Sequence, residues 1–383
     1  MNGKIPSRLA WSLAAVGLAV AVGCAPAAPA PTATPAAKPT AQEKPVAPAT
    51  PAPKPPEKAI SPSPVPGASK LKVGNLSLTG EGGVYVAMEK GYFKEENLEV
   101  ELVPFRTGAE QVAALAGGEL DVGYLSPDAG LFNAMLRGIA LKIVMSSGMG
   151  AKGGQKAAAV VQRKDLFDAG TVKSPADLKG RTVAITGEAD ASAIGVATAL
   201  ARGGLTFKDV KLVTMGFPDI MAAFGNKAID AGWEVEPFLT MGREQGFFVP
   251  WIYLGDLRPL HDSVVYAYSA KFAAGNPGAA RGFAVALLKG NRDYNEAFFG
   301  SGKGKAEVIA ALVKQTSVKD PAMYEKMGLA GAQPNGAVSI KSLLEDIDWY
   351  VANGQMKEKA SIETFVDTQY VEYALSKLGK VPE

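Results

Sequence analysis

One segment of the chain occurs twice without a gap, and this repeat limits the fold more than any other feature of the sequence. Residues 113–124 (AALAGGELDVGY) align with residues 222–233 (AAFGNKAIDAGW). Each copy has the pattern of a helix stopped by glycine, a short turn, and a buried strand that carries an aspartate and ends in glycine plus an aromatic residue. The repeat predicts a protein built from two similar halves.

Alternating strands and helices surround both copies. The first series has strands at 71–76, 99–105 and 120–124 and helices at 84–95 and 107–116. The second series has strands at 182–186, 210–215 and 229–233 and helices at 190–202 and 219–224. Two βαβαβ units imply two parallel sheets flanked by helices, which is an α/β fold with two lobes.

The remainder of the chain is expected to return to the first lobe. It looks mostly helical from about residue 257 onward, apart from one strand at 263–269. We therefore expect lobe 1 to contain residues 71–163 and 256–383, and lobe 2 residues 164–255. The two crossings are expected near 162–164 and 255–257.

The first 23 residues read as an export signal. Lys4 and Arg8 precede an apolar stretch that runs from residue 9 to residue 22. This stretch has the length of a signal-peptide core of about 7–15 residues and is too short to span a bilayer, which needs about 20. It ends in Ala-Val-Gly before Cys24, which resembles a bacterial lipobox. We expect lipid attachment to Cys24, with an ordinary cleaved signal as the alternative.

Residues 24–70 are expected to form a disordered tether. Residues 25–70 hold 14 of the 26 prolines, among alanine, threonine, serine and lysine. Proline fixes φ and removes a hydrogen-bond donor, and the segment has too little apolar surface for a core. The protein is therefore expected outside the cytoplasm, held to a membrane by lipid.

Charge and cysteine content exclude several classes of function. The net charge is +2, and it falls to zero without residues 1–23, so bulk charge does not attract nucleic acid. Cys24 is the only cysteine, which excludes disulfides, cysteine-based zinc sites and thiol catalysis. The chain shows no histidine cluster or phosphate-binding loop. We expect no cofactor and no metal, and a monomer.

Four motifs resemble one known family. They are residues 86–93 (VAMEKGYF), 118–123 (GELDVG), 177–184 (DLKGRTVA) and 236–238 (EPF). In this order they are similar to the substrate-binding proteins of nitrate-, sulfonate- and taurine-type importers, the NMT1/THI5-like group. The resemblance implies a type II periplasmic-binding-protein fold with a ligand cleft between two lobes. It also implies an ABC permease and ATPase as partners, and ligands that range from nitrate, sulfonates and aromatic acids to pyrimidines and riboflavin.

The binding site is expected where loops follow the carboxyl ends of the strands. Lobe 1 contributes loops 79–83, 106–110 and 126–128, and lobe 2 contributes 187–192, 216–219 and 234–237. Free backbone N–H groups at helix starts can accept an anion or a carbonyl. The candidate residues are Gly80, Glu81, Gly82, Phe105, Arg106, Thr107, Ser126, Asp128, Gly187, Glu188, Ser192, Phe217, Asp219, Trp233, Glu234 and Glu236.

Several candidates have a structural alternative. Ser126, Asp128, Asp190 and Asp219 are good helix N-caps, and the glycines can serve turns alone. Trp233 can equally belong to the core. Glu234 and Glu236 are harder to assign to packing, because two carboxylates beside a tryptophan at a strand end are seldom buried without a partner.

The charges of these loops favour a ligand that is not an anion. The loops hold eight carboxylates and a single cation, Arg106. A dedicated nitrate or sulfonate site would present more cationic or neutral donors. We expect a ligand with N–H, O–H or cationic groups, such as a pyrimidine-like or flavin-like ring stacked on Trp233 or Phe105, or an aromatic acid held by Arg106. Sulfonate, taurine or nitrate binding is the alternative.

Two other functions compete with solute capture. Some proteins of this fold synthesise the thiamine pyrimidine with a reactive histidine and a cysteine-rich iron motif. This chain has one histidine, His261, near the second crossing, and no cysteine after Cys24, so we expect no enzymatic activity. A ligand-sensing module for a membrane kinase would have the same sequence features as a transport protein.

Overall fold

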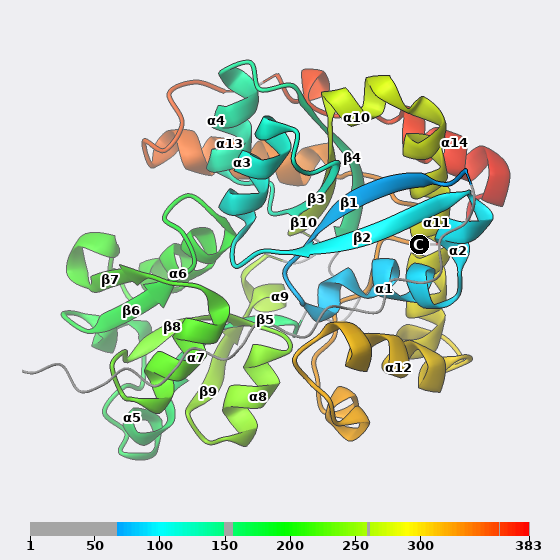
Figure 1. Ribbon diagram of the computed structural model, residues 1–383. Helices are drawn as coiled ribbons and strands as arrows, with labels where there is room; N and C mark the ends of the chain where they lie inside the picture. Colours follow the sequence, from blue (N-terminus) through cyan, green and yellow to red (C-terminus); the bar gives the residue numbers. More distant parts are fainter. Residues whose placement is uncertain (1–66, 149–155, 259–260, 360, 383) are drawn as a thin grey trace, which may run out of the picture. The chain divides into compact units, whose positions relative to one another are not determined.

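The structure is a computed structural model that describes residues 67–148, 156–258, 261–359 and 361–382. The signal segment, Cys24 and the tether up to residue 66 lie outside the described residues. Figure 1 shows the strands in two groups, which correspond to two five-stranded sheets. Among the described residues, no helix has both the length and the apolar character needed to cross a membrane.

The first sheet combines strands from both ends of the described chain. Its strand order is β2 (Leu98–Pro104), β1 (Ser69–Asn75), β3 (Val122–Leu125), β10 (Val264–Ser269) and β4 (Leu141–Gly148). β1 runs parallel to β2 and β3, whereas β10 is antiparallel to β3 and β4. The late strand predicted at 263–269 therefore does return to the first lobe.

The second sheet repeats this arrangement. Its order is β7 (Lys211–Thr214), β6 (Thr182–Ile185), β8 (Ala231–Val235), β5 (Ala158–Arg163) and β9 (Phe248–Tyr253). β6 is parallel to β7 and β8, and β5 is antiparallel to β8 and β9. β3 and β8, which carry the repeated sequence, occupy the same third place in the two sheets. The two-lobed α/β prediction is confirmed.

Three details differ from the sequence prediction. Each sheet is mixed rather than parallel, because a strand that has just crossed from the other lobe (β5 or β10) enters in the opposite direction. β5 belongs to the second sheet, so the first crossing precedes Ala158 instead of lying at 162–164. The helix expected up to residue 95 is two helices, because Gly91 adopts φ 77° between them.

Helices cover both faces of each sheet. Those of the first lobe are α1 (Gly82–Glu89), α2 (Tyr92–Glu95), α3 (Gly108–Gly117), α4 (Ala129–Leu136), α10 (Ala270–Gly275), α11 (Pro277–Phe299), α12 (Lys305–Gln315), α13 (Ile340–Ala352) and α14 (Gln369–Leu378). Those of the second are α5 (Lys164–Asp168), α6 (Ala191–Arg202), α7 (Phe217–Gly225), α8 (Phe238–Glu244) and α9 (Leu254–Leu257). Short 3₁₀ turns lie at Thr79–Glu81, Pro175–Leu178, Phe207–Asp209, Pro321–Glu325 and Ile362–Thr364.

The cores explain why the central strands are almost wholly apolar. In lobe 1, Val73 packs toward Phe283 of α11, whereas Val265 belongs to the cluster on the side of α3, α4 and α13. In lobe 2, Val183 packs in the cluster of α6 and Ala184 in that of α7. A sheet covered on both faces has only its strand ends free for function.

Candidate ligand-binding site

A cavity of about 330 Å³ lies where the carboxyl ends of the two sheets meet. The loops that line it follow β1, β2 and β3 in lobe 1 and β6, β7 and β8 in lobe 2. These are the six strand ends that the sequence places at the site. Its volume is at the small end of the range for cofactor and small-molecule sites, about 300–1,000 Å³.

Eleven of the sixteen candidate residues line this cavity. They are Gly80, Arg106, Thr107, Ser126, Asp128, Gly187, Glu188, Ser192, Phe217, Trp233 and Glu236. Gly80 has a specific reason to be glycine, because a Cβ there would lie 2.4 Å from the hydroxyl oxygen of Tyr124. Contact of these residues with a ligand stays a prediction.

The other five candidates lie outside the lining. Gly82 packs against the ring of Tyr294, and Phe105 packs at the edge of the α3–α4–α13 cluster. Asp219 is turned to Arg106, whose Nη2 lies 3.0 Å from its Oδ2. Glu81 and Glu234 are buried in the lobes. Gly82 has no side chain, and the side chains of the other four point into the protein or along its surface.

Glu81 holds the first loop together. Its carboxylate accepts hydrogen bonds from the backbone N–H of Leu76 at 3.1 Å and Leu78 at 2.8 Å, and from the Tyr85 hydroxyl at 2.9 Å. Burial raises the pKa of Glu81 to about 7, although these hydrogen bonds oppose the rise. The side chain fixes the loop that carries Gly80 and lies outside the lining of the cavity.

Two aspartates both line the cavity and cap helices. Asp128 Oδ1 accepts from the N–H of Leu131 at 2.7 Å at the start of α4. Asp190 Oδ1 accepts from the N–H groups of Ser192 and Ala193 at the start of α6, at 2.9 and 3.2 Å. The capping alternative therefore holds for both. Ser126 does not cap a helix, since its hydroxyl donates to the Ser263 carbonyl at 3.4 Å.

The neighbouring acids Glu234 and Glu236 differ in their surroundings. Glu236 accepts from Thr240 N–H and Oγ1 at 3.0 and 2.8 Å, and from the Gly328 N–H at 3.0 Å. It therefore connects lobe 2 to a segment of lobe 1. Both oxygens of Glu234 are buried without a hydrogen-bond partner among the described residues, and burial raises its pKa well above the usual range. Burial therefore disfavours the charged form of Glu234.

Trp233 serves the core and the cavity at once. Only 3% of its surface is exposed, and its ring packs on α6 at Gly195, where a Cβ would lie 2.2 Å from Cζ3. The same side chain lines the cavity. Tyr124, its counterpart in the repeat, also lines the cavity, so the repeat itself could have revealed that residue.

Most of the cavity-lining residues that were not predicted from the sequence are apolar. It includes Leu76, Leu78, Ala157, Val235, Leu254, Val264 and Ala330. Such residues resemble core residues in a sequence. The contributions of Leu254, Val264 and Ala330 come from segments far from the repeat, and no local pattern places them at this site.

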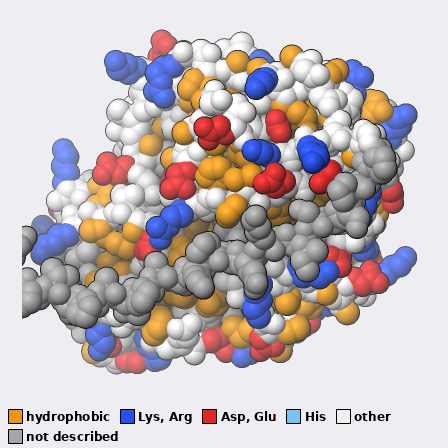
Figure 2. Space-filling model, viewed as in Figure 1, with side chains coloured by type: hydrophobic (Ala, Val, Ile, Leu, Met, Phe, Trp, Pro, Cys, Tyr) orange, Lys and Arg blue, Asp and Glu red, His pale blue; other side chains and the backbone are white. Residues whose placement is uncertain are grey.

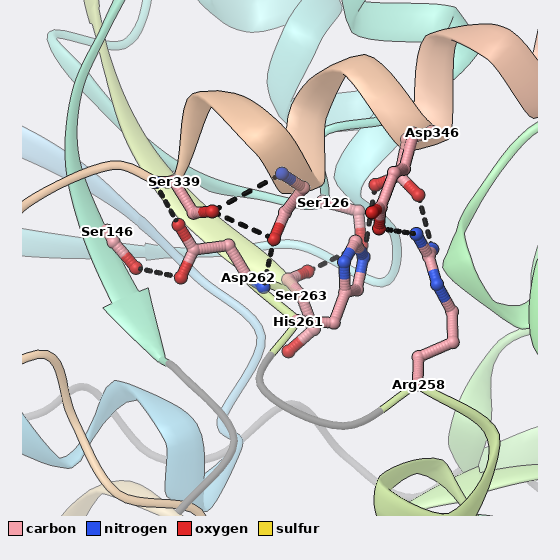
Figure 3. Close-up of polar contacts among 10 residues, drawn as sticks. Ser126, Ser146, Arg258, His261, Asp262, Ser263, Ser339 and Asp346 are labelled. Carbon is pink, nitrogen blue, oxygen red and sulfur yellow. Dashed lines mark hydrogen bonds and ion pairs between the residues drawn. The ribbon is translucent and has the colours of Figure 1, made fainter.

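The second crossing is anchored by a buried polar network (Figure 3). His261 Nε2 lies 3.1 Å from Asp346 Oδ2 on α13, and Arg258 Nη1 contacts the other oxygen of Asp346. Asp262 accepts from Ser146 Oγ at 2.9 Å and from the Ser339 N–H at 2.6 Å. His261 is thus a buried residue of the crossing, as its sequence position suggests, and not a surface residue.

Serine, histidine and aspartate meet here without forming a catalytic triad. A triad needs a hydrogen bond from the serine hydroxyl to the imidazole. Ser126 instead donates to Ser263, and His261 Nδ1 has no partner among the described residues. Within the same residues, no group of three or more His, Cys, Asp or Glu side chains could hold a metal ion.

The fold is also found in several solved binding proteins. The periplasmic nitrate-binding protein NrtA from Synechocystis PCC 6803 matches with a TM-score of 0.69 at 16% identity, over 82% of this chain and 90% of that chain. The alkanesulfonate-binding protein SsuA from Xanthomonas axonopodis pv. citri, bound to MOPS, gives 0.65 at 18% identity, over 78% and 98%. The desulfurization enzyme DSZB shares the fold at 0.58 and 15% identity, over 81% and 99%. These matches define a type II periplasmic-binding-protein fold.

Sequence comparison identifies the family. The profile described as NMT1/THI5 like matches residues 79–296, which is more than half of the chain. The protein belongs to the NMT1/THI5-like family. A protein of Brucella abortus (strain 2308) described only as a binding protein is 30% identical over 146 residues, 38% of this chain. That match spans 41% of the length of the curated relative.

Proposed function

We propose that this protein captures a small organic molecule in the cavity between its lobes and delivers it to an ABC importer outside the cytoplasm. The observation that carries the proposal is the convergence of six strand-end loops, three from each sheet, on one cavity. Contacts to both lobes make ligand binding favour their closure. The lipid anchor at Cys24, a monomeric state and partnership with a permease and ATPase are parts of the same proposal.

Acidic residues at the helix starts argue against an anionic ligand. Four of the helices that begin at the cavity carry a carboxylate at the N-cap or in the first turn: Glu110 on α3, Asp128 on α4, Asp190 on α6 and Asp219 on α7. Helix N-termini attract anions through free N–H groups and the helix dipole. Here the protein's own carboxylates already use that attraction.

The single cation of the lining is also engaged. Among the described residues of the wall, Arg106 alone is a lysine or arginine, and it is paired with Asp219 across the lobes. On the face shown in Figure 2, Lys and Arg are interspersed with Asp and Glu, with no broad field of one sign. A nitrate or sulfonate would have to share this guanidinium with Asp219.

The walls favour a flat, largely apolar ligand. Phe217, Trp233 and Tyr124 supply aromatic surface, and the apolar residues named above supply most of the rest. Hydroxyl groups come from Thr79, Thr107, Ser126, Thr186, Ser192 and Ser263, and carboxyl groups from Asp128, Glu188, Asp190 and Glu236. A neutral heteroaromatic molecule with a few N–H or O–H groups matches this lining best. An aromatic acid held by Arg106 is the second ligand class.

Titration calorimetry against matched compounds tests the proposal. The panel pairs benzamide with benzoate and adds pyrimidines, riboflavin, taurine and nitrate. The proposal expects neutral rings to bind, benzamide more tightly than benzoate, and taurine and nitrate not at all. Ala330→Trp, which fills the cavity, should abolish binding, whereas Ala352→Trp at an exposed site should not. Tight taurine or nitrate binding would overturn the assignment of the ligand.

The identity of the membrane partner distinguishes a transport role from a sensing role. Co-purification of the lipidated protein with a permease and ATPase supports transport. Co-purification with a membrane kinase alone contradicts it.

A further inference from the structure

Two carboxyl groups from opposite lobes are buried together at the cavity. Asp128 begins α4 in lobe 1, and Asp190 begins α6 in lobe 2. Both line the cavity, and their charges interact unfavourably. Asp128 is 9% exposed, and Asp190 is partly buried. The lobes thus bring two like charges into one poorly hydrated space.

Backbone contacts close the lobes directly beside this pair. The N–H of Ala129, the residue after Asp128, donates to the carbonyl of Ala189, the residue before Asp190, at 3.0 Å. The side-chain amide of Gln355 donates to the Glu188 carbonyl in the same region. When the lobes separate, these bonds break and water reaches both carboxyl groups.

Each acid accepts hydrogen bonds from its own lobe, and Asp190 accepts more of them than Asp128. Asp128 Oδ1 accepts from Leu131 N–H at 2.7 Å. Asp190 accepts from the N–H groups of Ser192 and Ala193, from the Ser192 hydroxyl, and from Thr186 Oγ1, the last at 2.6 Å. These partners lie in the same lobe as each acid, so they persist when the lobes part. The change on closure is dehydration and the approach of the second acid.

The surrounding groups do not neutralise the pair. Asp346 and Tyr350 of α13 lie near Asp128, and Tyr350 also lies near Asp190. Asp346 is itself paired with Arg258 and His261, so those two cationic or ionisable side chains are engaged with a different carboxylate. Glu188, the remaining charged neighbour in the loop of Asp190, is exposed and negative. No described cation contacts Asp128 or Asp190.

We propose that the lobes close with the uptake of about one proton by the Asp128–Asp190 pair, so that closure, and with it ligand capture, is coupled to pH. The inference extends the proposed solute-binding function to its regulation. Asp128 and Asp190 act as positioning residues, because protonation removes a repulsion that opposes the approach of their loops.

The direction of the coupling follows from the pKa of Asp128. Burial, with a contribution from Asp190, raises the pKa of Asp128 from 3.8 to about 7 in the closed arrangement. The hydrogen bond from Leu131 lowers this pKa and so opposes the rise. The open arrangement returns the group to water and toward its ordinary pKa. Closure therefore binds a proton mainly between pH 4 and 7. The ratio of closed to open protein should fall up to about tenfold per pH unit in that interval and level off above it.

Energy transfer between the lobes tests this without any ligand. The full chain carries Cys24→Ser, with Lys94→Cys on α2 and Lys208→Cys in lobe 2 as exposed labelling sites. The inter-lobe distance is measured from pH 4.5 to 8.5. The expected result is a shift toward longer distances as the pH rises to about 7. Asp128→Asn, a neutral and similarly shaped cap, should keep the lobes closed at pH 8.

Matched variants make the outcome decisive. Asp320→Asn also alters a helix N-cap, outside the lining of the cavity, and should show the same pH response as the unmodified chain. Asp190→Asn gives a second test if Asp128→Asn folds poorly. A distance that does not change with pH, or the same change in Asp128→Asn, overturns the inference. The calorimetry panel is an independent test. If the compounds bind but the inter-lobe distance does not depend on pH, only the proton coupling is wrong. If the distance depends on pH but no compound binds, only the proposed function is wrong.

Discussion

Arg106 and Asp219 join the two lobes at the edge of the cavity, with Nη2 of the arginine 3.0 Å from Oδ2 of the aspartate. Arg106 follows β2 in lobe 1, and Asp219 lies in the first turn of α7 in lobe 2. The sequence placed both among the ligand contacts. Their pairing makes them a connection between the lobes, and ligand contact by either residue stays a prediction.

Asp219→Asn should loosen this connection and free Arg106. Both side chains are largely exposed, so the ion pair contributes only about 0.2–1 kcal/mol. We expect release of a bound neutral compound to become about two- to fivefold faster, and binding of benzoate to improve relative to benzamide. Stopped-flow dissociation and calorimetry measure these two effects. Unchanged benzoate affinity in Asp219→Asn would show that the ion pair does not keep Arg106 from binding a carboxylate.

Gly195→Ala should disturb the ring of Trp233. The added methyl group would lie 2.2 Å from the indole, so the ring or α6 must move. Such overpacking typically costs about 1–3 kcal/mol. We expect a lower midpoint of unfolding and weaker binding of aromatic compounds, measured by urea titration and calorimetry. Gly275→Ala is the control, since nothing lies within 4 Å of its Cβ. Equal stability of the two variants would contradict the packing described for Trp233.

Glu81→Gln should reduce the dependence of stability on pH. The pKa of Glu81 is raised from 4.5 to about 7 in the folded protein by burial, so its contribution to stability is greatest below pH 4.5 and declines as the pH rises to 7. A shift of this size corresponds to about 3 kcal/mol. Urea denaturation at pH 5 and pH 8 should therefore show a smaller difference for Glu81→Gln than for the unmodified chain. Glu89→Gln, at an exposed ion pair, should leave that difference unchanged.

Cys24→Ser tests the proposed lipid anchor. The change should remove the mass added by lipid and move the protein from the detergent phase to the aqueous phase on phase separation. Persistent partitioning into detergent would contradict lipidation at this residue.

The repeat made the architecture predictable. Because residues 113–124 and 222–233 share one pattern, they predicted equivalent strands, and β3 and β8 do occupy equivalent places. The strands outside the repeat were harder to predict. β4, β5 and β9 were not predicted, because short apolar runs carry no period that separates a buried strand from a buried helix.

The loops that form the site were predictable from the sequence, whereas the directions of their side chains were less so. The strand ends determine which backbone segments meet, and the six predicted loops do line one cavity. Side-chain direction depends on packing that a single sequence does not encode. Glu81 turns inward to bond Leu76 and Leu78, and Glu234 faces the core, although both sit in the expected loops.

We expect a neutral organic ligand in the cavity between the lobes. Native mass spectrometry of the protein, purified without denaturation, tests this expectation. The expected result is an adduct with the mass of a small uncharged organic compound, absent from Ala330→Trp and present in Ala352→Trp. An adduct that survives in Ala330→Trp, or one identified as a sulfonate or nitrate, would contradict it.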